Sequence, residues 1–322
     1  TIPLPVAGKD MNSILKSLET GVDNIFTGDK YAQYLQTMSK FHRYSFNNTL
    51  LIAMQRPDAT LVTGYRNWQS MGKQVKKGEK GITILAPAPI KRKREQEILD
   101  QNRKPLLDAD GKPRTEEVEV VIPRFKPTTV FDISQTDGEP IETLAPEELT
   151  EAVADYDLFM EAITAVSTVP IRFDEIAGEA KGYYHSVDKE IVIQKGMSDS
   201  QTIKTAIHET GHARLHDKDL MAEQGIEKDR LTKEVEAESV AYCVCSAFGV
   251  DTSEYSFPYI AGWSSGRDMK ELKTSMDTIR KTAGEMIDEL SEKLQELFTE
   301  KKLLLESEQK EKLIPAMEAA GY

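Results

Sequence analysis

The stretch from Thr202 to Leu215 reads TIKTAIHETGHARL and contains the pattern His208-Glu209-Thr210-Gly211-His212. The segment before the first histidine is apolar at helical spacing, so we predict a helix here. On that helix the two histidines lie one turn apart on the same face, and both imidazoles reach one cation. Glu209 points about 100° further round the helix. The stretch therefore predicts a metal-bearing helix inside a buried hydrolytic site.

Zinc fits such a helix, because zinc favours imidazole nitrogens with a carboxylate and keeps one position for water in catalytic sites. The third ligand is expected from the acidic segment 234–238, EVEAE, where Glu234 and Glu238 share a helix face and Glu236 points elsewhere. We assign Glu234 to the metal and Glu238 to orienting a ligand histidine. The reverse assignment and a solvated acidic face are the alternatives.

The remaining candidates concern the chemistry beside the metal. Glu209 is the predicted general base, which takes a proton from the metal-bound water and passes it to the leaving amine. His216 lies about 12 Å along the helix axis from His208, which excludes a shared metal and predicts a structural, surface or second-site role. The run 183–185, YYH, offers oxyanion partners, with strand packing as the alternative.

The bulk composition places the protein in a broad class. The chain has 322 residues, enough for two ordinary domains, and a net charge of −13. Cys243 and Cys245 are two apart in a helical stretch and cannot easily bridge, which fits a reducing compartment. We found neither a bilayer-spanning apolar run nor a secretory signal, so we expect a cytoplasmic protein without membrane contact.

Positive charge is concentrated in one segment. Between Lys30 and Arg94 there are 13 Lys and Arg residues but only Asp58 and Glu79 with negative charge. Cations that follow phosphates, interleaved with aromatic rings on which bases stack, suit single-stranded DNA, although aromatic core packing is the alternative. The assigned interface comprises Arg43, Tyr44, Asn47, Asn48, Gln55, Arg56, Tyr65, Trp68, Lys73, Lys76, Lys77 and Lys80.

The organisation along the chain predicts an α+β protein. Residues 10–55 read as helical, and a strand at 82–85 belongs to a small α+β module. The charged stretch 91–115 predicts an exposed loop or mobile hairpin, and strands at 118–122 and 128–133 are expected to complete the module's sheet. Glycine and prolines at 137–146 predict a linker. The expected domains are 1–142, 143–266 and a helical extension, 267–322.

The last of these segments has apolar residues at helical spacing from Leu272 to Leu297. Packing of this helix against the body is the favoured interpretation. A dimerising coiled coil is the alternative, although charges and Gly284 interrupt its seam. The composition alone does not fix the oligomeric state.

Several stretches resemble one known family. FHRYSFNN at 41–48, QRPDAT at 55–60, GYRNWQ at 64–69, VKKGEKGITILAP at 75–87 and FDISQT at 131–136 resemble the N-terminal domain of ArdC-type antirestriction proteins. HETGH, EVEAE and PYIAGW at 258–263 resemble the zincin-type metallopeptidase domain that accompanies it, itself similar to ImmA/IrrE peptidases. The stretch 91–115 and the tail after about residue 300 look less typical of that family.

The resemblance implies a single-stranded-DNA-binding module joined to a zinc metallopeptidase domain, acting around DNA transfer and evasion of restriction on mobile elements. It also supports Glu234 and Glu238 as the functional acidic pair. Two other hypotheses stay open. One is a non-proteolytic protein that coats single strands and keeps a structural or vestigial metal site. The other is a peptidase whose basic module binds RNA or a protein.

Overall fold

The computed structural model describes residues 10–98, 100–101, 104–108, 110–139, 155–253, 255 and 257–319, with side chains described up to residue 305. The predicted mixture of helices and strands is confirmed. Three helices begin the chain: α1 (Met11–Ile25), α2 (Gly28–Lys40) and α3 (Phe46–Gln55). Asp10 and Ser45 begin α1 and α3 as N-caps, each accepting a backbone N–H with its side chain.

A small antiparallel sheet follows, with strand order β1–β6–β3. Its strands are β1 (Val62–Gly64), β3 (Ile82–Pro87) and β6 (Phe125–Asp132). Helix α4 (Tyr65–Ser70) follows β1. The short strand β2 (Gln74–Val75) pairs with β7 (Thr136–Asp137), which comes directly after the 3-10 turn η1 (Ile133–Gln135). The predicted strand at 82–85 therefore forms one edge of this sheet.

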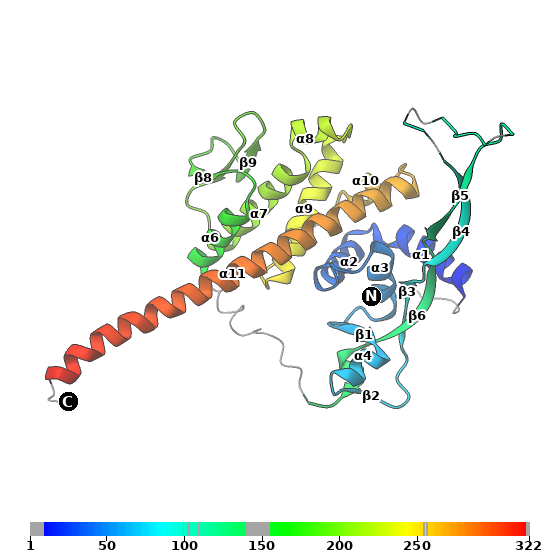
Figure 1. Cartoon of the computed structure of the whole chain (residues 1–322). Helices are drawn as coiled ribbons and strands as arrows, with labels where there is room; N and C mark the ends of the chain where they lie inside the picture. The colour runs from blue at the N-terminus through cyan, green and yellow to red at the C-terminus, as the bar shows by residue number, and fades with distance from the viewer. Residues whose placement is uncertain are drawn as a thin grey trace.

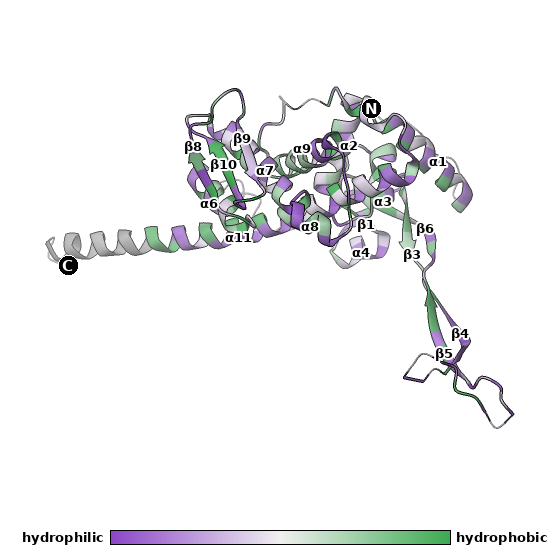
Figure 2. Ribbon diagram, turned by 90° about the horizontal axis from the view of Figure 1, so that it is seen from above, coloured by the Kyte–Doolittle hydropathy of each residue, from purple (hydrophilic) through white to green (hydrophobic). Residues whose placement is uncertain are grey.

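Strands β4 (Ile90–Glu97) and β5 (Thr115–Ile122) form a separate two-stranded ribbon that projects from the body (Figures 1 and 2). The hairpin expected in the charged stretch is therefore present. The expectation that residues 118–122 join the sheet begun at Ile82 is wrong, because they pair with 90–94. Lys91 and Lys93 form ion pairs across the ribbon with Glu119 and Glu117, which explains how so charged a sequence forms strands.

The second half of the chain carries a three-stranded sheet and the helices around it. Helix α6 (Tyr156–Val166) precedes β8 (Ile171–Asp174), β9 (Gly182–His185) and β10 (Glu190–Gln194), and β10 lies between a parallel β8 and an antiparallel β9. Helices α7 (Asp199–Leu215), α8 (Lys218–Glu223), α9 (Arg230–Ala247) and α10 (Ile260–Ser264) follow. Strand β9 is thus an edge strand, and α7 packs beside it.

The chain ends in one long helix, α11 (Met269–Ala319), which crosses the body and then extends beyond it (Figure 1). Its predicted apolar stripe, from Leu272 to Leu297, is buried against α6 and α9, so packing against the body is confirmed. A Cβ at Gly284 would lie 3.3 Å from the His42 ring, and Asp288 bonds both His42 and Arg43. Gly284 therefore lets α11 approach the N-terminal half closely.

One hydrophobic core includes α1, α2 and α3 together with α6, α7, α9 and α11. Tyr31 of α2 reaches Ser239 of α9 with its hydroxyl at 2.8 Å. The linker predicted around 137–146 lies largely outside the described residues, which omit 140–154. Among the described helices, none has the length and hydrophobicity needed to cross a bilayer.

Candidate metal centre

Helix α7 is held close to both of its neighbours by glycines. Gly211 faces α9, where an added Cβ would lie 3.6 Å from the backbone of Ala237. At Gly182 on β9, a Cβ would meet Thr205 of α7 at 2.5 Å, which a real side chain cannot do without a shift. The two close contacts place the HETGH turn of α7 between the edge strand β9 and the helix α9.

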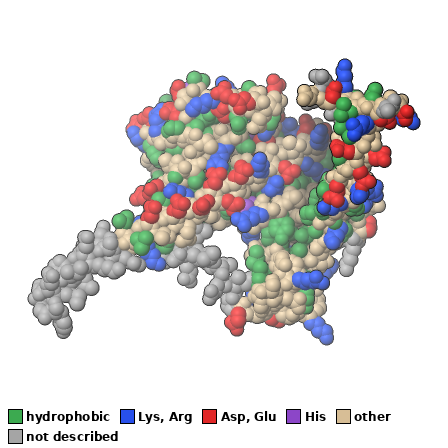
Figure 3. Space-filling model, viewed as in Figure 1, with side chains coloured by type: hydrophobic (Ala, Val, Ile, Leu, Met, Phe, Trp, Pro, Cys, Tyr) green, Lys and Arg blue, Asp and Glu red, His purple; other side chains and the backbone are tan. Residues whose placement is uncertain are grey.

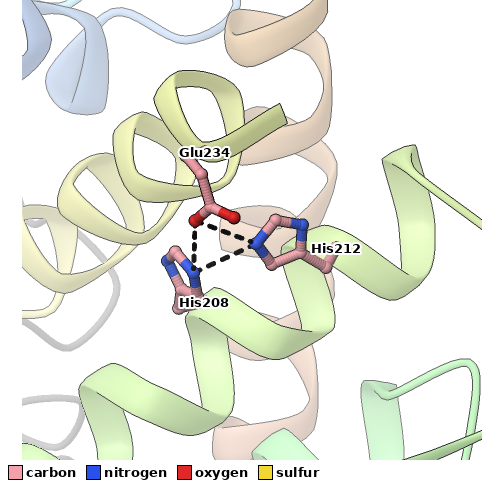
Figure 4. A group of neighbouring side chains, drawn as sticks. All are labelled: His208, His212 and Glu234. Atoms are coloured by element: carbon pink, nitrogen blue, oxygen red, sulfur yellow. Dashed lines mark hydrogen bonds and ion pairs between the residues drawn. The ribbon is translucent and has the colours of Figure 1, made fainter. Parts of the chain in front are cut away.

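The structure brings the three predicted metal ligands together. The Nε2 atoms of His208 and His212 lie 3.1 Å apart, and Oε2 of Glu234 lies 3.8 Å and 3.6 Å from them. The side chains come from α7 and α9 and point toward one another (Figure 4). Two imidazole nitrogens and one carboxylate oxygen within 4.8 Å of one another fit a divalent transition metal with an open position.

The electrostatics of the site favour the protonation states in which these side chains bind a metal. Burial, followed by the neighbouring His212, lowers the pKa of His208 to about 4, which keeps its ring neutral with a lone pair available. The proximity of His212, whose Nε2 lies 3.6 Å from Oε2, is the main cause that lowers the pKa of Glu234, and partial burial opposes it. Glu234 is therefore an anion beside neutral imidazole, the protonation state that binds a metal.

Glu209 lies beside this group and is buried. Its burial raises the pKa to about 7, while the backbone N–H of Tyr184 donates to its carboxylate and partly opposes that shift. This bond ties the base to the edge strand β9. The carboxyl is thus fixed in position next to the site at which a metal-bound water would lie.

His216 is not at the surface, as one interpretation of the sequence expected, but buried behind His212. Their Nδ1 atoms are 3.0 Å apart, and Nε2 of His216 lies 3.0 Å from Oε2 of Glu236. Glu236 is fully buried and also accepts from Lys228 at 2.6 Å and Ser275 at 2.8 Å. His216 therefore lies outside the ligand group, yet it is the hydrogen-bond partner of a ligand.

The prediction that Glu238 orients a ligand histidine is wrong. The hydrogen bond that the structure gives its carboxylate comes from the Tyr259 hydroxyl, not from a ligand histidine. The supporting carboxylate behind His212 is Glu236, reached through His216. Glu236 was expected to point away from the site, because helical periodicity places it on a different face of α9 from Glu234. In the structure that face of α9 packs against His216 and α11.

The three candidate oxyanion partners have different environments. The Tyr184 hydroxyl donates to Asp217 at 2.5 Å, and His185 pairs with Asp188 at 3.0 Å. Tyr183 is 39% exposed and lines the cleft beside the metal group. Its side chain nevertheless lies on the face of β9 opposite to Gly182 and Tyr184, the residues that face α7.

The metal group lies between two adjoining pockets. One has a volume of 380 Å³ and is lined by Lys181, Lys204 and Glu238, and the other has 600 Å³ and is lined by Lys218, Arg230 and Lys233. His208 and Glu209 line both pockets. The two pockets are therefore halves of one cleft that passes over the candidate metal position.

Several of the residues assigned to a DNA interface are buried or bonded within the fold. Trp68 is fully buried and donates to the carbonyl of Phe131, so its ring cannot stack on a base. The side chains of Asn48 and Gln55 each bond both backbone groups of one β3 residue, Leu85 and Thr83. Sequence patterns missed these roles because an amide that satisfies a sheet edge looks the same as one that faces solvent.

Other residues assigned to the DNA interface form contacts within the protein. Lys73 is buried against the carbonyl of Gly138, and the Tyr44 hydroxyl donates to the carbonyl of Val62. Arg43 pairs with Asp288, Arg56 bonds Ser134, and Lys76 bonds the Ser134 carbonyl. Asn47 is half-buried. Arg43 and Lys76 stay exposed despite these contacts, and so do Lys77, Lys80 and Tyr65, whose ring contacts Phe131.

An HETGH helix and a glutamate on the next long helix define the zincin-like class of metal site. Residues 6–131 match the N-terminal domain of anti-restriction factor ArdC, and residues 164–245 match the IrrE N-terminal-like domain. The chain therefore has the domain architecture of ArdC-type proteins, an ArdC-like N-terminal domain followed by an IrrE-like domain. The first match covers the N-terminal helices and sheet, and the second covers the half that carries the candidate metal centre.

Related proteins include an uncharacterized protein of Bacillus anthracis, 28% identical over 85% of this chain and 50% of that protein. Two proteins named DNA primase TraC from Escherichia coli are 32% and 33% identical over 69% and 60% of this chain, and over 15% and 18% of their own lengths. This chain thus spans half or less of these relatives.

Two crystal structures of the antirestriction protein ArdC from plasmid R388 are similar to this chain. The metal-free one has a TM-score of 0.45 at 23% identity, covering 80% of this chain and 86% of that one. The Mn(II)-bound one has a TM-score of 0.47 at 21% identity, covering 87% and 97%.

Proposed function

We propose that this protein is a zinc-dependent metallopeptidase joined to a module that binds single-stranded DNA without sequence preference, in an ArdC-like antirestriction role during the transfer of mobile-element DNA. The observation that supports the enzymatic half is the position of Glu209. A buried carboxyl fixed beside a two-histidine, one-glutamate group suits hydrolysis, whereas a purely structural zinc site has no need of a general base.

In this proposal His208, His212 and Glu234 hold the metal. A zinc ion held there would supply Lewis-acid chemistry, lowering the pKa of a bound water and polarising the scissile carbonyl. Glu209 would serve as the general base that accepts a proton from the attacking water and as the acid that returns it to the leaving amine. The edge strand β9 lies along the cleft and offers its free edge to an extended polypeptide, as edge strands do in β-augmentation.

The test for proteolysis uses the zinc-loaded protein and a mixture of denatured proteins, with new N-termini read by mass spectrometry. We expect cleavage by the unmodified protein and at least a roughly 100-fold loss in Glu209→Gln, the scale of a general base. Glu227→Gln, at an exposed glutamate outside the cleft, is the matched control. Absence of cleavage, or equal cleavage by Glu209→Gln, would refute the peptidase.

The DNA-binding half of the proposal is supported by the similarity to ArdC and by the surface of the N-terminal half. A group of hydrophobic side chains there has Lys and Arg side chains around it (Figure 3). Lys77 and Lys80 are exposed, and Tyr65 is 42% exposed and beside Phe131. Exposed cations beside an aromatic ring suit a phosphate backbone with unpaired bases.

Affinity for a single-stranded oligonucleotide, measured over a range of salt concentrations, tests this half. Lys77→Ala with Lys80→Ala should weaken binding and reduce the salt slope by about one unit per lost phosphate contact. Lys195→Ala with Lys270→Ala removes two exposed cations from the other half and should change neither. Binding that survives metal removal while cleavage is absent would favour the protective, non-proteolytic alternative.

A further inference from the structure

The cleft over the metal group differs in charge from the rest of the protein. The chain carries a net charge of −13, yet the larger pocket is lined by Lys218, Arg230 and Lys233. The only carboxylates lining that pocket are Glu209 and Glu234, which belong to the candidate metal site. When these two are engaged by a metal and its water, the pocket presents three cations to a substrate.

These cations are available for a ligand. Within the described part of the chain, none of the three has an ion pair, whereas neighbouring cations such as Lys228, Lys189 and Arg267 are each paired with carboxylates. Lys218 and Arg230 are exposed and Lys233 is half-buried. They come from the first turns of two helices, α8 and α9, and line the same pocket over the metal group.

We propose that the cleft selects acidic polypeptide segments, with Asp or Glu side chains of the substrate bound by Lys218, Arg230 and Lys233 on one side of the scissile bond. This inference rests on the proposed peptidase function for the cutting of the bound segment. Because most of the surface repels an acidic chain, this cluster decides where such a chain approaches. The adjoining edge strand β9 suits a polypeptide backbone better than a phosphodiester.

Binding is tested first, with zinc-loaded Glu209→Gln protein. The probes are fluorescein-labelled short peptides rich in Asp and Glu, and peptides of the same length with Lys and Arg in place of the acids. We expect the acidic peptides to bind at least tenfold more tightly. Lys218→Glu with Lys233→Glu should weaken them roughly 20-fold, since each reversal turns an attraction into a repulsion, and should strengthen the basic peptides.

The matched control is Lys195→Glu with Lys270→Glu, which changes the net charge equally at exposed sites outside the cleft and should leave both affinities unchanged. Equal binding of the two peptide classes, or acidic binding that ignores the Lys218 and Lys233 reversals, overturns the inference. A third result also overturns it: the reversals abolish binding of a single-stranded oligonucleotide but leave binding of acidic peptides unchanged. The cations would then bind phosphates.

Cleavage of the same peptides by the unmodified protein separates the two proposals. Cleavage without preference for acidic sequences would support the peptidase and refute the substrate class. Acidic peptides that bind through Lys218 and Lys233 but stay intact would support the substrate-binding cleft and refute the peptidase. Cleavage confined to the acidic peptides and reversed in preference by the double substitution is the result expected if both hold.

Discussion

At single residues, the orientation of His212 depends on a chain of buried hydrogen bonds. When Nε2 of a neutral His212 faces the metal, its Nδ1 carries the proton and donates to Nδ1 of His216. Nε2 of His216 then carries a proton and donates to Glu236, which Lys228 and Ser275 also hold. The carboxylate that usually supports a metal-bound imidazole therefore acts here through a second imidazole.

We predict that His216→Ala weakens zinc affinity by about tenfold, the lower end of what losing such a partner costs. Competition with a chromogenic chelator measures it. His185→Ala removes a histidine that pairs with Asp188 away from the ligand group, and should leave the affinity unchanged. Unaltered zinc affinity in a folded His216→Ala protein would show that His212 needs no such support.

The same residues show what sequence could and could not predict. His208, Glu209, His212 and Glu234 follow from helical periodicity and ligand chemistry, both of which are local. His216 and Glu236 could not be found that way, because their pairing depends on how α7, α9 and α11 pack together. Trp68 was misassigned for the same reason, since an aromatic ring in a basic segment carries no signal of its burial.

Among the helices, α9 supplies the third candidate ligand, Glu234. Asp229 is its N-cap and accepts from the backbone N–H and the hydroxyl of Thr232 and from Arg267. Partial burial opposes ionisation, but these hydrogen bonds prevail and lower the pKa of Asp229 to about 2. The folded pKa lies below the unfolded value of about 3.9, so ionised Asp229 stabilises the fold above that value.

The stabilisation by Asp229 should therefore be lost as the pH falls from about 4 to about 2. Asp229→Asn keeps a capping side chain but removes the charge, so it should lower the free energy of unfolding by about 0.5 kcal/mol at neutral pH, the scale of an exposed ion pair, with a smaller deficit at pH 2. Urea titrations at several pH values measure this. Asp199→Asn, at an exposed first-turn position of α7, is the comparison. A deficit that is constant with pH would contradict the assigned role.

Strands and helices differed in how far sequence predicted them. The apolar stripe of α11 and the charged hairpin were read correctly, because period and composition determine both. The partner strand of Val118–Ile122 was predicted wrongly, because the residue pattern of a strand indicates that it pairs but does not identify its partner. In the fold its partner is the preceding strand β4, with which it also forms the ion pairs of Lys91 and Lys93.

Across the chain as a unit, the N-terminal helices and the metal-bearing half share one hydrophobic core. Phe26 of the first half contacts Trp263 of the second, and Tyr31 contacts Phe257. Sequence indicated two domains because the composition changes at a linker, and composition cannot show that α2 packs on α9. The N-terminal half and the half that carries the candidate metal centre are therefore expected to unfold together.

The two tryptophans provide the test, since Trp68 lies in one half and Trp263 in the other. In Trp68→Phe protein, the emission of Trp263 and the far-UV ellipticity should change at the same urea concentration. The same coincidence is expected for Trp68 emission in Trp263→Phe protein. Separate transitions in either variant would mean that the two halves fold independently.

Metal content decides whether the triad of His208, His212 and Glu234 is a metal centre. After zinc loading and exhaustive dialysis, elemental analysis should find about one zinc per chain in the unmodified protein and in Glu209→Gln, as a catalytic site with a separate base requires. His212→Ala and Glu234→Ala should lose that zinc. An unmodified protein without zinc, or a Glu234→Ala protein that keeps it as tightly, would contradict the site described here.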